Sequence, residues 1–293
     1  MPKASIIVPV YNEEMCILEV LNDLKKLGEG FEILVIDDGS VDNTHQLIQN
    51  SGVKFIRHSS RIGNGAAVKT GIENSSSDIL IVFDGDGQYR SSEIPRLLNS
   101  MDGMDLIVGA RIKKSEQTML RRIGNIFLSR FASFLTMRDI PDLTSGLRVF
   151  RKDRIMKIFD ILPDKYSLPS TSTILFLSLG FKVKFMPVKM YKRSDGSASK
   201  LPILKNGVKF LIIIMKLVFL FNPRRVFSYL SLFILSVGII EGLSRLIIDH
   251  TLSKWLDIFL TTSIIVFFLG FLAEHKSKIH QGLVRRKIRP YLE

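Results

Sequence analysis

The sequence predicts an α/β protein: a mostly parallel, Rossmann-like sheet domain, followed by an interfacial amphipathic helix and a two-helix transmembrane hairpin. Three observations support this prediction. Apolar, strand-like runs alternate with helical stretches over the first half of the chain, which is typical of βα units in a parallel sheet. Acidic and polar residues follow several of these runs directly. From residue 210 onward the composition becomes strongly hydrophobic, in runs long enough for membrane helices.

The strands and helices of the sheet domain are expected in alternation. Strands are expected at Ser5–Val10, Phe31–Asp37, Val53–Arg57, Asp78–Phe83, Asp105–Gly109, Gly146–Phe150 and Lys182–Val188. Helices are expected at Glu13–Leu27, Val41–Asn50 and Met119–Thr136. Apolar, β-branched runs bounded by turn residues favour buried strands. In an open parallel sheet the carboxyl ends of the strands form one edge, where ligands bind.

Two aspartates follow the predicted strand at Asp78–Phe83. Asp84 and Asp86 are separated by a glycine, which allows a sharp turn, and Gln88 stands two residues further on. Hard oxygen ligands at this edge suit a Mg²⁺ or Mn²⁺ ion that carries a substrate diphosphate. A plain turn is the alternative, because Asp and Gly are also common turn residues.

Two more polar clusters are expected at the same edge. Pro9, Tyr11 and Glu13 lie at the end of the first predicted strand, and Asp37 and Asp38 lie at the end of the second. Carboxylates there can accept hydrogen bonds from a base or a ribose, and the ring of Tyr11 can stack on a base. Because three strands end in such clusters, the pattern favours a nucleotide site over unrelated turns.

A glycine-rich segment, Gly63–Ala67, opens another predicted helix after the third strand. Backbone amides at a helix start can bind phosphate. A tight helix start without a ligand is the alternative, and for this segment taken by itself it is the favoured one.

The formal net charge of +13 indicates an anionic partner. Nucleic acid is one class, but no nucleic-acid-binding motif or basic stripe interleaved with aromatic residues is present, so no such partner is expected. An anionic membrane surface and phosphorylated substrates are the other class. The hydrophobic final third of the chain favours this second class.

The final third contains two apolar segments that can span a bilayer, at residues 226–248 and 256–273. Arginines precede the first span and a basic tail at residues 274–293 follows the second. The positive-inside rule therefore places both termini and the sheet domain in the cytoplasm, on an integral protein of the cell membrane. Glu241 and Arg245 lie four residues apart in the first span. They are interpreted as a self-neutralising pair, with a contact to lipid or to a second copy in a homo-oligomer as the alternative.

The segment between the sheet domain, at residues 1–201, and the spans is expected to form an interfacial helix at residues 202–222. Lys205, Lys209 and Lys216 share one helical face, so they can lie near lipid headgroups. A third span is the alternative, but it would place Lys216 deep in hydrocarbon.

In their order along the chain, these motifs resemble those of family 2 glycosyltransferases with the GT-A fold. Among these the sequence is most similar to the polyprenyl-phosphate glycosyltransferases, such as dolichyl-phosphate mannose synthase and polyisoprenyl-phosphate glucosyltransferase. The matching runs are Ile7–Glu13, Asp37–Ser40, Asn64–Ala66, Asp84–Gln88, Val108–Arg111, Asp142–Arg148, Arg193 and Ser197–Leu201. The two spans resemble the membrane anchor of many bacterial and archaeal members.

The resemblance implies a role for each matching residue. The residues implied in binding the nucleotide sugar are Pro9, Tyr11, Glu13, Asp37, Asp38, Asp84, Arg193 and Lys200. Those implied in binding the metal, Mg²⁺ or Mn²⁺, are Asp84, Asp86 and Gln88. Those implied in binding the acceptor phosphate are Arg111, Arg122 and Lys200, and those implied in catalysis are Asp86, Asp142 and Arg111.

The activity implied by the resemblance is transfer of a sugar from a nucleotide-diphosphate sugar, of the GDP-mannose or UDP-glucose type, to a dolichyl or undecaprenyl phosphate. The reaction would be metal-dependent and would invert the anomeric carbon. A processive polysaccharide synthase should carry a Gln-x-x-Arg-Trp motif, but the only tryptophan is Trp255, beside the predicted spans. A transferase for a different glycan or a protein acceptor, and a non-catalytic membrane scaffold, are the remaining alternatives.

Overall fold

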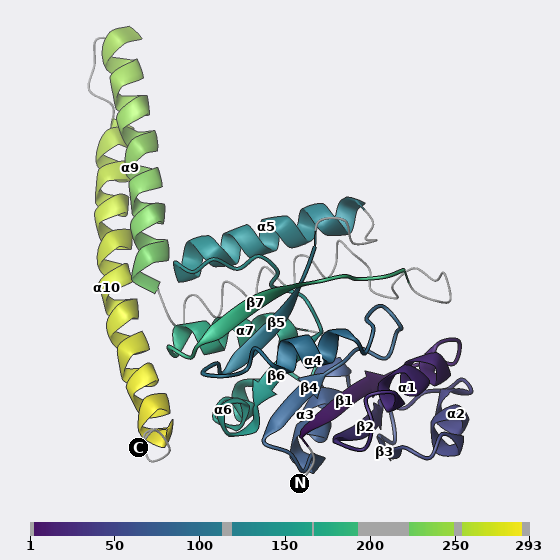
Figure 1. The fold of residues 1–293 in the computed structure, drawn as a ribbon. Coiled ribbons are helices and arrows are strands. Elements are labelled where there is room, and N and C mark those ends of the chain that lie inside the picture. Colours follow the sequence, from purple (N-terminus) through teal and green to yellow (C-terminus); the bar gives the residue numbers. More distant parts are fainter. Residues whose placement is uncertain (1–2, 113–118, 166, 193–222, 249–253, 289–293) are drawn as a thin grey trace. The chain divides into compact units, whose positions relative to one another are not determined.

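The computed structural model describes residues 3–112, 119–165, 167–192, 223–248 and 254–288. The chain divides into two compact units, one of residues 1–134 and 138–213 and the other of residues 135–137 and 214–293. The first unit contains a sheet with helices around it, and the second contains two long helices (Figure 1).

The first unit is built on a seven-stranded sheet of order β3-β2-β1-β4-β6-β5-β7. The strands are β1 Ala4–Val10, β2 Phe31–Asp37, β3 Lys54–Arg57, β4 Ile79–Val82, β5 Leu106–Arg111, β6 Arg148–Arg151 and β7 Val183–Val188. All neighbouring pairs are parallel except those of β6, which runs antiparallel to β4 and to β5. The mostly parallel sheet predicted from the sequence is thus confirmed. Its seven predicted strands are all present, with ends that differ by at most two residues.

The core lies around the central strand β1, whose seven residues are all buried. Helix α1, Ile17–Lys25, packs on this region with Ile17, Val20, Leu21 and Leu24, at the spacing of one helical face. Burial of each such side chain contributes about 2 kcal/mol to stability. The strands that carry the predicted site residues are therefore held rigidly.

The remaining helices of this unit vary in how well the sequence predicts them. They are α2 Thr44–Asn50, α3 Asn64–Asn74, α4 Glu93–Leu98, α5 Met119–Thr136, α6 Lys152–Met156 and α7 Leu168–Ser178, with the 3₁₀ helix η1 Phe159–Ile161. The sequence predicts α5 with its observed bounds. It misses α7, because the first nine residues of this helix are buried on nearly every side and show no amphipathic period. It also misses α4 and α6, which are only six and five residues long.

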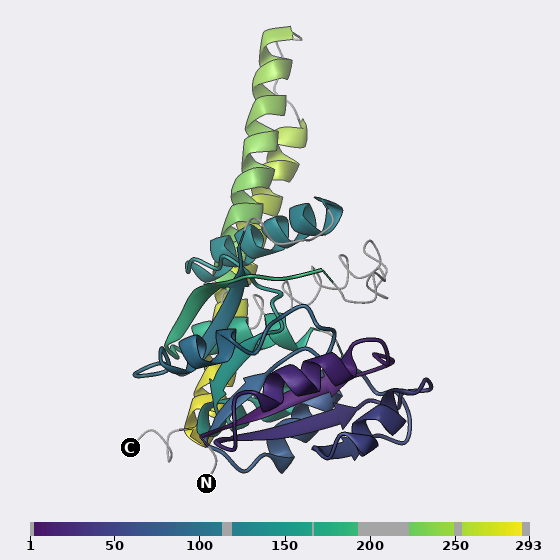
Figure 2. The same ribbon diagram turned by 45° about the vertical axis from the view of Figure 1, so that its right-hand side comes forward.

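The second unit is a helical hairpin of α9, Pro223–Ile248, and α10, Lys254–Ile288, which lie side by side in both views (Figures 1 and 2). Gly238 faces α10 so closely that a Cβ there would lie 2.4 Å from the Cβ of Phe259. Small residues of this kind allow membrane helices to pack tightly. Outside this contact the hairpin exposes large apolar side chains, such as Phe233, Ile247, Phe268 and Leu272.

Residues 223–248 and 254–279 are each long and apolar enough to cross a membrane. The predicted spans lie within these two helices, and the predicted tail begins inside α10, which continues to Ile288. Glu241 and Arg245 form an ion pair with each other, with 3.4 Å between Oε1 and Nε. The predicted interfacial helix at residues 202–222 lies outside the described residues. The domain limits inferred from the sequence stay predictions.

Candidate functional site

The three predicted polar clusters lie at one edge of the sheet. Strands β1, β2 and β4 are parallel neighbours, and Val10 pairs in register with Asp37. The amide of Asp38 donates to the carbonyl of Val10 over 2.9 Å. The amide of Phe83, just before Asp84, donates to the carbonyl of Ile7 over 2.9 Å. The carboxyl ends of the three strands are therefore adjacent, as the sequence predicts.

Asp37 and Asp38 are both buried, and their carboxylates bind protein groups. Asp37 Oδ1 accepts a hydrogen bond from the Ser40 amide over 2.9 Å, and Oδ2 lies 3.4 Å from His45 Nδ1 and from Arg57 Nε. These contacts fix the loop that follows β2. Direct contact of Asp37 with a nucleotide stays a prediction.

Asp38 organises the loop that follows β3. Its Oδ1 lies 2.9 Å from His58 Nδ1 and accepts from the Ile62 amide over 3.0 Å, while Oδ2 accepts from the Gly63 amide over 2.9 Å. The other ring nitrogen of His58 lies 2.9 Å from Thr70 Oγ1. Sequence reasoning missed His58, because nothing in its local sequence indicates a partner twenty residues away. Nucleotide binding by Asp38 stays a prediction.

Tyr11, the residue predicted to stack on the base, carries a guanidinium on one face of its ring. The Cζ atom of Arg61 lies 4.0 Å from the ring centroid, in cation–π contact. The turn after Tyr11 is fixed by two hydrogen bonds, from the Asn12 amide to Ser40 Oγ at 3.0 Å and from the Glu13 amide to Thr44 Oγ1 at 2.8 Å. The segment that contains Tyr11 and Glu13 is thus bound to the loop that follows β2.

The Asp84–Gln88 segment is a turn that presents two carboxylates. Asp86 Oδ1 accepts from the Gln88 amide over 3.1 Å, as in an Asx turn, and the Gln88 carbonyl accepts from the Tyr191 amide over 2.9 Å. The turn and the metal site are therefore compatible interpretations. Among the described residues no group of three or more His, Cys, Asp and Glu side chains could hold a metal ion. Two carboxylates and an amide oxygen fit an ion whose other ligands are substrate phosphates.

Arg111 and Asp142 form a largely buried, bidentate ion pair. Nε of Arg111 lies 2.6 Å from Oδ2 of Asp142, and Nη2 lies 2.7 Å from Oδ1. The Arg111 amide also donates to Oδ2 over 3.0 Å, and Nη2 donates to Thr144 Oγ1. Among the described contacts, the Arg111 side chain donates through Nε and Nη2.

The charge states of this pair follow from its geometry. Burial acts to raise the pKa of Asp142, but the hydrogen bonds and charge of Arg111 outweigh burial and hold this pKa below its ordinary value. Burial likewise acts to lower the pKa of Arg111, and Asp142 outweighs it, so that this pKa is raised. Asp142 is therefore an ionised partner of Arg111 and is poorly suited to accept a proton.

Two buried residues to which the sequence assigned no role lie next to this pair. Arg148 is fully buried and donates to the carbonyls of Ser145 and Leu143, over 2.8 and 3.1 Å. Burial lowers the pKa of Arg148 to about 9, although the charge of Asp142 acts to raise it. The hydroxyl of Tyr89 lies 3.2 Å from Ser145 Oγ, and burial raises the pKa of Tyr89. An arginine in an apolar strand was the available signal for Arg148.

The remaining predicted residues are placed only in part. Arg193 and Lys200 lie outside the described residues, and Arg122 belongs to α5 but its side chain is not among those described. The segment Gly63–Ala67 opens α3 as predicted. The Ala66 amide at this helix start donates to the carbonyl of Asp164 over 2.8 Å, which favours the tight helix start over a phosphate cradle.

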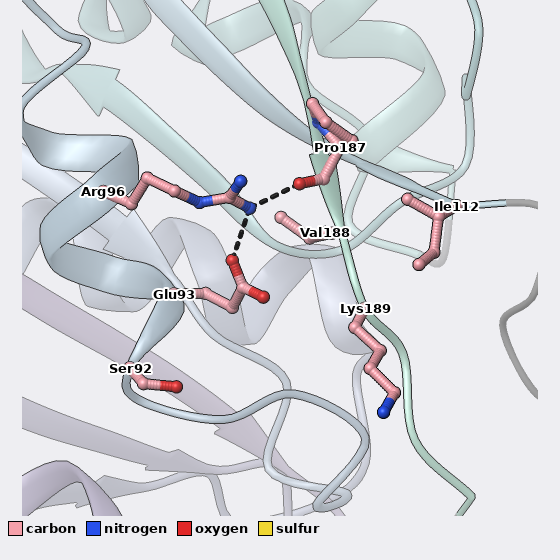
Figure 3. A pocket seen from close by; sticks show the side chains of 7 residues that line it. All are labelled: Ser92, Glu93, Arg96, Ile112, Pro187, Val188 and Lys189. Carbon is pink, nitrogen blue, oxygen red and sulfur yellow. Dashed lines mark hydrogen bonds and ion pairs between the residues drawn. The ribbon is translucent and has the colours of Figure 1, made fainter.

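A surface groove of about 480 Å³ lies between α4 and β7 (Figure 3). It is lined by Ser92, Glu93, Arg96, Ile112, Pro187, Val188 and Lys189. Nη2 of Arg96 donates to Glu93 Oε2 over 2.6 Å and to the carbonyl of Pro187, so the charge of this arginine is neutralised within the groove (Figure 3). The groove contains none of the predicted site residues.

Comparison with known proteins identifies the family of this chain. Residues 5–159 match the model of glycosyl transferase family 2, and residues 222–279 match that of the GtrB C-terminal hairpin. Glycosyltransferase AglJ of Haloferax volcanii is 30% identical over 213 residues, which cover 70% of this chain and 69% of that protein. The UDP-N-acetylglucosamine–dolichyl-phosphate N-acetylglucosaminyltransferase of Methanococcus voltae is 28% identical over 211 residues, covering 63% of this chain and 84% of that protein.

Solved structures agree on the fold. Glucosyl-3-phosphoglycerate synthase from Mycobacterium tuberculosis, in complex with Mn²⁺, UDP-glucose and phosphoglyceric acid, has a TM-score of 0.59 at 17% identity, covering 74% of this chain and 80% of that chain. At this identity the likeness shows the fold alone. The match of more than half of the chain to the family model, together with the identity to AglJ, leads to one conclusion: this chain belongs to glycosyl transferase family 2 and is a glycosyltransferase.

Proposed function

We propose that this enzyme transfers a sugar from a nucleotide-diphosphate sugar to a polyprenyl phosphate at the cytoplasmic face of the cell membrane, with Mg²⁺ or Mn²⁺ and with inversion. The observation that carries the proposal is that one chain contains both a family 2 domain and two helices of membrane length. Two relatives support it by name, the dolichyl-phosphate hexose transferase of Haloferax volcanii, 32% identical over 157 residues, and the Methanococcus voltae enzyme.

The acceptor chemistry requires little base catalysis. A phosphate monoester carries about −1.5 to −2 charge at neutral pH, so its oxygen is already a nucleophile. This agrees with the ionised, Arg111-bound state of Asp142, which is poorly suited to be a base. The enzyme must instead hold two anionic groups together and stabilise the diphosphate that leaves.

One set of residues would stabilise the leaving diphosphate, and a second set would offset the repulsion between the two anionic groups. Asp84, Asp86 and Gln88 would hold a divalent ion, which supplies positive charge to the leaving diphosphate. Arg111 would offset the repulsion between donor and acceptor, with Asp142 orienting its guanidinium. The remaining basic residues in the proposal, Arg122, Arg193 and Lys200, would contact the acceptor phosphate or the donor diphosphate.

The proposed arrangement in the membrane follows the sequence. The catalytic domain at residues 1–201 and both termini would lie in the cytoplasm, an interfacial helix at residues 202–222 would lie along the bilayer, and residues 226–248 and 256–273 would span it. This arrangement would hold the site where a lipid phosphate can reach it.

The test uses membranes that contain the full-length protein, labelled UDP-N-acetylglucosamine, UDP-glucose or GDP-mannose, and polyprenyl phosphate. One donor should yield a labelled, acid-labile glycolipid, and EDTA should prevent its formation. Asp86→Ala should abolish transfer, whereas Asp102→Ala, which removes an exposed carboxylate at the opposite edge of the sheet, should not. Product formation that survives EDTA would contradict the metal assignment. Absence of glycolipid with every donor would contradict the assignment of polyprenyl phosphate as the acceptor.

A further inference from the structure

One face of α5 carries three polar residues spaced four apart, Asn125, Ser129 and Ser133. Residues at this spacing lie on the same side of a helix. Each of the three accepts a hydrogen bond from the segment of residues 140–144, which we name the Asp142 loop. The donors are Thr144 Oγ1 to Asn125 Oδ1 at 3.1 Å, the Leu143 amide to Ser129 Oγ at 3.0 Å, and the Ile140 amide to Ser133 Oγ at 2.9 Å.

Helix formation does not explain these three residues. Asn and Ser are weaker helix formers than Ala, because they compete for backbone hydrogen bonds. Ser129 is only 4% exposed, so a contribution to solubility does not explain it either. The solvent face of α5 lies elsewhere, at exposed residues such as Ile126, Phe127 and Arg130. Asn125, Ser129 and Ser133 are therefore explained by their hydrogen bonds with the Asp142 loop.

The Asp142 loop controls the position of Arg111. Asp142 lies between two residues whose amides donate to α5, and its two carboxylate oxygens bind Nε and Nη2 along one edge of the Arg111 guanidinium. Thr144 connects the two sets of contacts directly, because its hydroxyl donates to Asn125 and accepts from Arg111 Nη2. A continuous path of hydrogen bonds thus runs from α5 to the guanidinium.

The same loop is held a second time by a buried cation. Arg148 binds the carbonyls of Leu143 and Ser145, and its Nη1 donates to Thr173 Oγ1 of α7 over 2.6 Å. The amide and the carbonyl of Leu143 are therefore bound from α5 and from β6 respectively. A loop fixed in this way cannot shift without breaking several hydrogen bonds.

We propose that Asn125, Ser129 and Ser133 are positioning residues, which orient Arg111 through the Asp142 loop for the phosphoryl groups of the reaction. This inference rests on the proposed function, because it assigns Arg111 to the charge that develops during transfer. A misplacement of about 1 Å in such a group can lower the rate up to about a hundredfold. We expect kcat to fall and the donor KM to stay nearly unchanged. The reason is that the residues proposed to bind the nucleotide, such as Pro9, Tyr11 and Asp37, lie on other segments.

The first experiment measures kcat and the donor KM of the full-length protein, normalised to folded enzyme recovered by size exclusion. Ser129→Ala should lower kcat about tenfold with the donor KM within about twofold of wild type. Ser75→Ala is the matched control, because it also removes a buried serine hydroxyl that bonds to the backbone, here by donating to the Ile72 carbonyl at the far end of α3. This control should retain the wild-type kcat.

A double-mutant cycle tests whether Asn125 acts through Thr144. Thr144→Val removes the hydroxyl that binds both Asn125 and Arg111, and should lower kcat. Addition of Asn125→Ala to Thr144→Val should then cause no further loss, since coupled residues are non-additive. Ser133→Thr, which keeps the hydroxyl, should restore the kcat that Ser133→Ala loses. A full additive loss in the cycle, or equal kcat for the two Ser133 variants, would overturn the proposed path.

Hydrogen exchange of the Leu143 amide separates this inference from the proposed function. Ser129→Ala should accelerate exchange at Leu143 whether or not any sugar is transferred. If wild type transfers sugar, and Ser129→Ala accelerates exchange but leaves kcat unchanged, the positioning role is refuted while the proposed function stands. If wild type transfers no sugar to polyprenyl phosphate, the proposed function fails. Independently of that result, unchanged exchange at Leu143 in Ser129→Ala would refute the inference that Ser129 restrains the Asp142 loop.

Discussion

The position of the Asp84 carboxylate depends on the absence of a side chain at Gly146. A Cβ built on Gly146 would lie 2.0 Å from Oδ2 of Asp84, so the carboxylate occupies the space that any other residue at position 146 would need. The glycine lies just before β6, the antiparallel strand next to β4. The pairing of these two strands therefore places the proposed metal ligand.

Replacement of this glycine is expected to disable the proposed metal site. Gly146→Ala should displace the Asp84 carboxylate, lower the free energy of unfolding by about 1–3 kcal/mol, and lower Mn²⁺-dependent transfer. Calorimetric titration with Mn²⁺ and UDP and an activity assay measure the effects. Gly30→Ala is the matched control, since a Cβ at Gly30 meets no atom within 4 Å. Equal metal binding by Gly146→Ala and wild type would contradict the role of Asp84.

The ion pair of Asp142 predicts a defined dependence of stability on pH. Because the pKa of Asp142 is lower in the folded protein than its unfolded value of about 3.9, its contribution is complete above about pH 4. This contribution disappears as the pH falls through the folded pKa. Asp142→Asn should therefore unfold with a free energy about 3 kcal/mol lower at pH 7, since it leaves Arg111 without its buried partner.

Thermal unfolding of wild type and Asp142→Asn at pH 7, 5 and 3 checks this sign. The difference between them should be equal at pH 7 and pH 5 and should shrink at pH 3. Asp102→Asn, at an exposed position, should show no difference at any of these values. A difference that grows toward low pH would show instead that folding raises the pKa of Asp142.

At the level of the helices, the start of α3 shows how packing overrides intrinsic propensity. A Cβ at Gly65 would lie 2.1 Å from the carbonyl oxygen of Pro163 and 2.5 Å from that of Lys165. The backbone at residues 163–165 therefore rests directly on the helix start. Alanine is the better helix former by about 1 kcal/mol, but here there is no space for its methyl group.

Two glycine replacements are expected to have opposite effects for this reason. Gly65→Ala should lower the free energy of unfolding by more than about 1 kcal/mol through the clash with Pro163. Gly124→Ala in α5 should raise it by about 0.5–1 kcal/mol, since a Cβ there meets nothing within 4 Å. Chemical denaturation of both variants measures the two signs. A stabilising Gly65→Ala would show that the backbone at residues 163–165 can move away at little cost.

For the whole molecule, the hairpin and the sheet domain are expected to contribute separable functions. The sheet domain has its own buried core around β1, and α9 and α10 expose mainly apolar side chains. Removal of the residues from 222 onward should therefore leave nucleotide binding intact but reduce transfer to long-chain polyprenyl phosphate. Titration with UDP and assays with short-chain and long-chain acceptors measure the two effects. Equal transfer to the long-chain acceptor would show that the hairpin serves only as an anchor or in assembly.

Much of this architecture is predictable from the sequence, because it depends on local signals. Apolar runs with turn residues at their ends specify the seven strands, and the run lengths near the C-terminus specify two membrane-length helices. Parallel strands share one carboxyl edge, so the juxtaposition of Tyr11, Asp37 and Asp84 also follows from their places after these strands. The pairing of Glu241 with Arg245 follows from helical spacing.

Only the tertiary structure decided what these side chains contact. Arg111 and Asp142, Asp38 and His58, and Asp84 and Gly146 meet across loops and between strands, and no local pattern encodes such distant pairs. The burial of Arg148 and the hydrogen bonds between α5 and the Asp142 loop depend in the same way on how the elements pack. The sequence alone determined the seven strands, the two membrane-length helices and the edge that carries the polar residues, because periodicity and strand ends are local properties. The orientation of each polar group in the site was decided by packing between residues far apart in the chain.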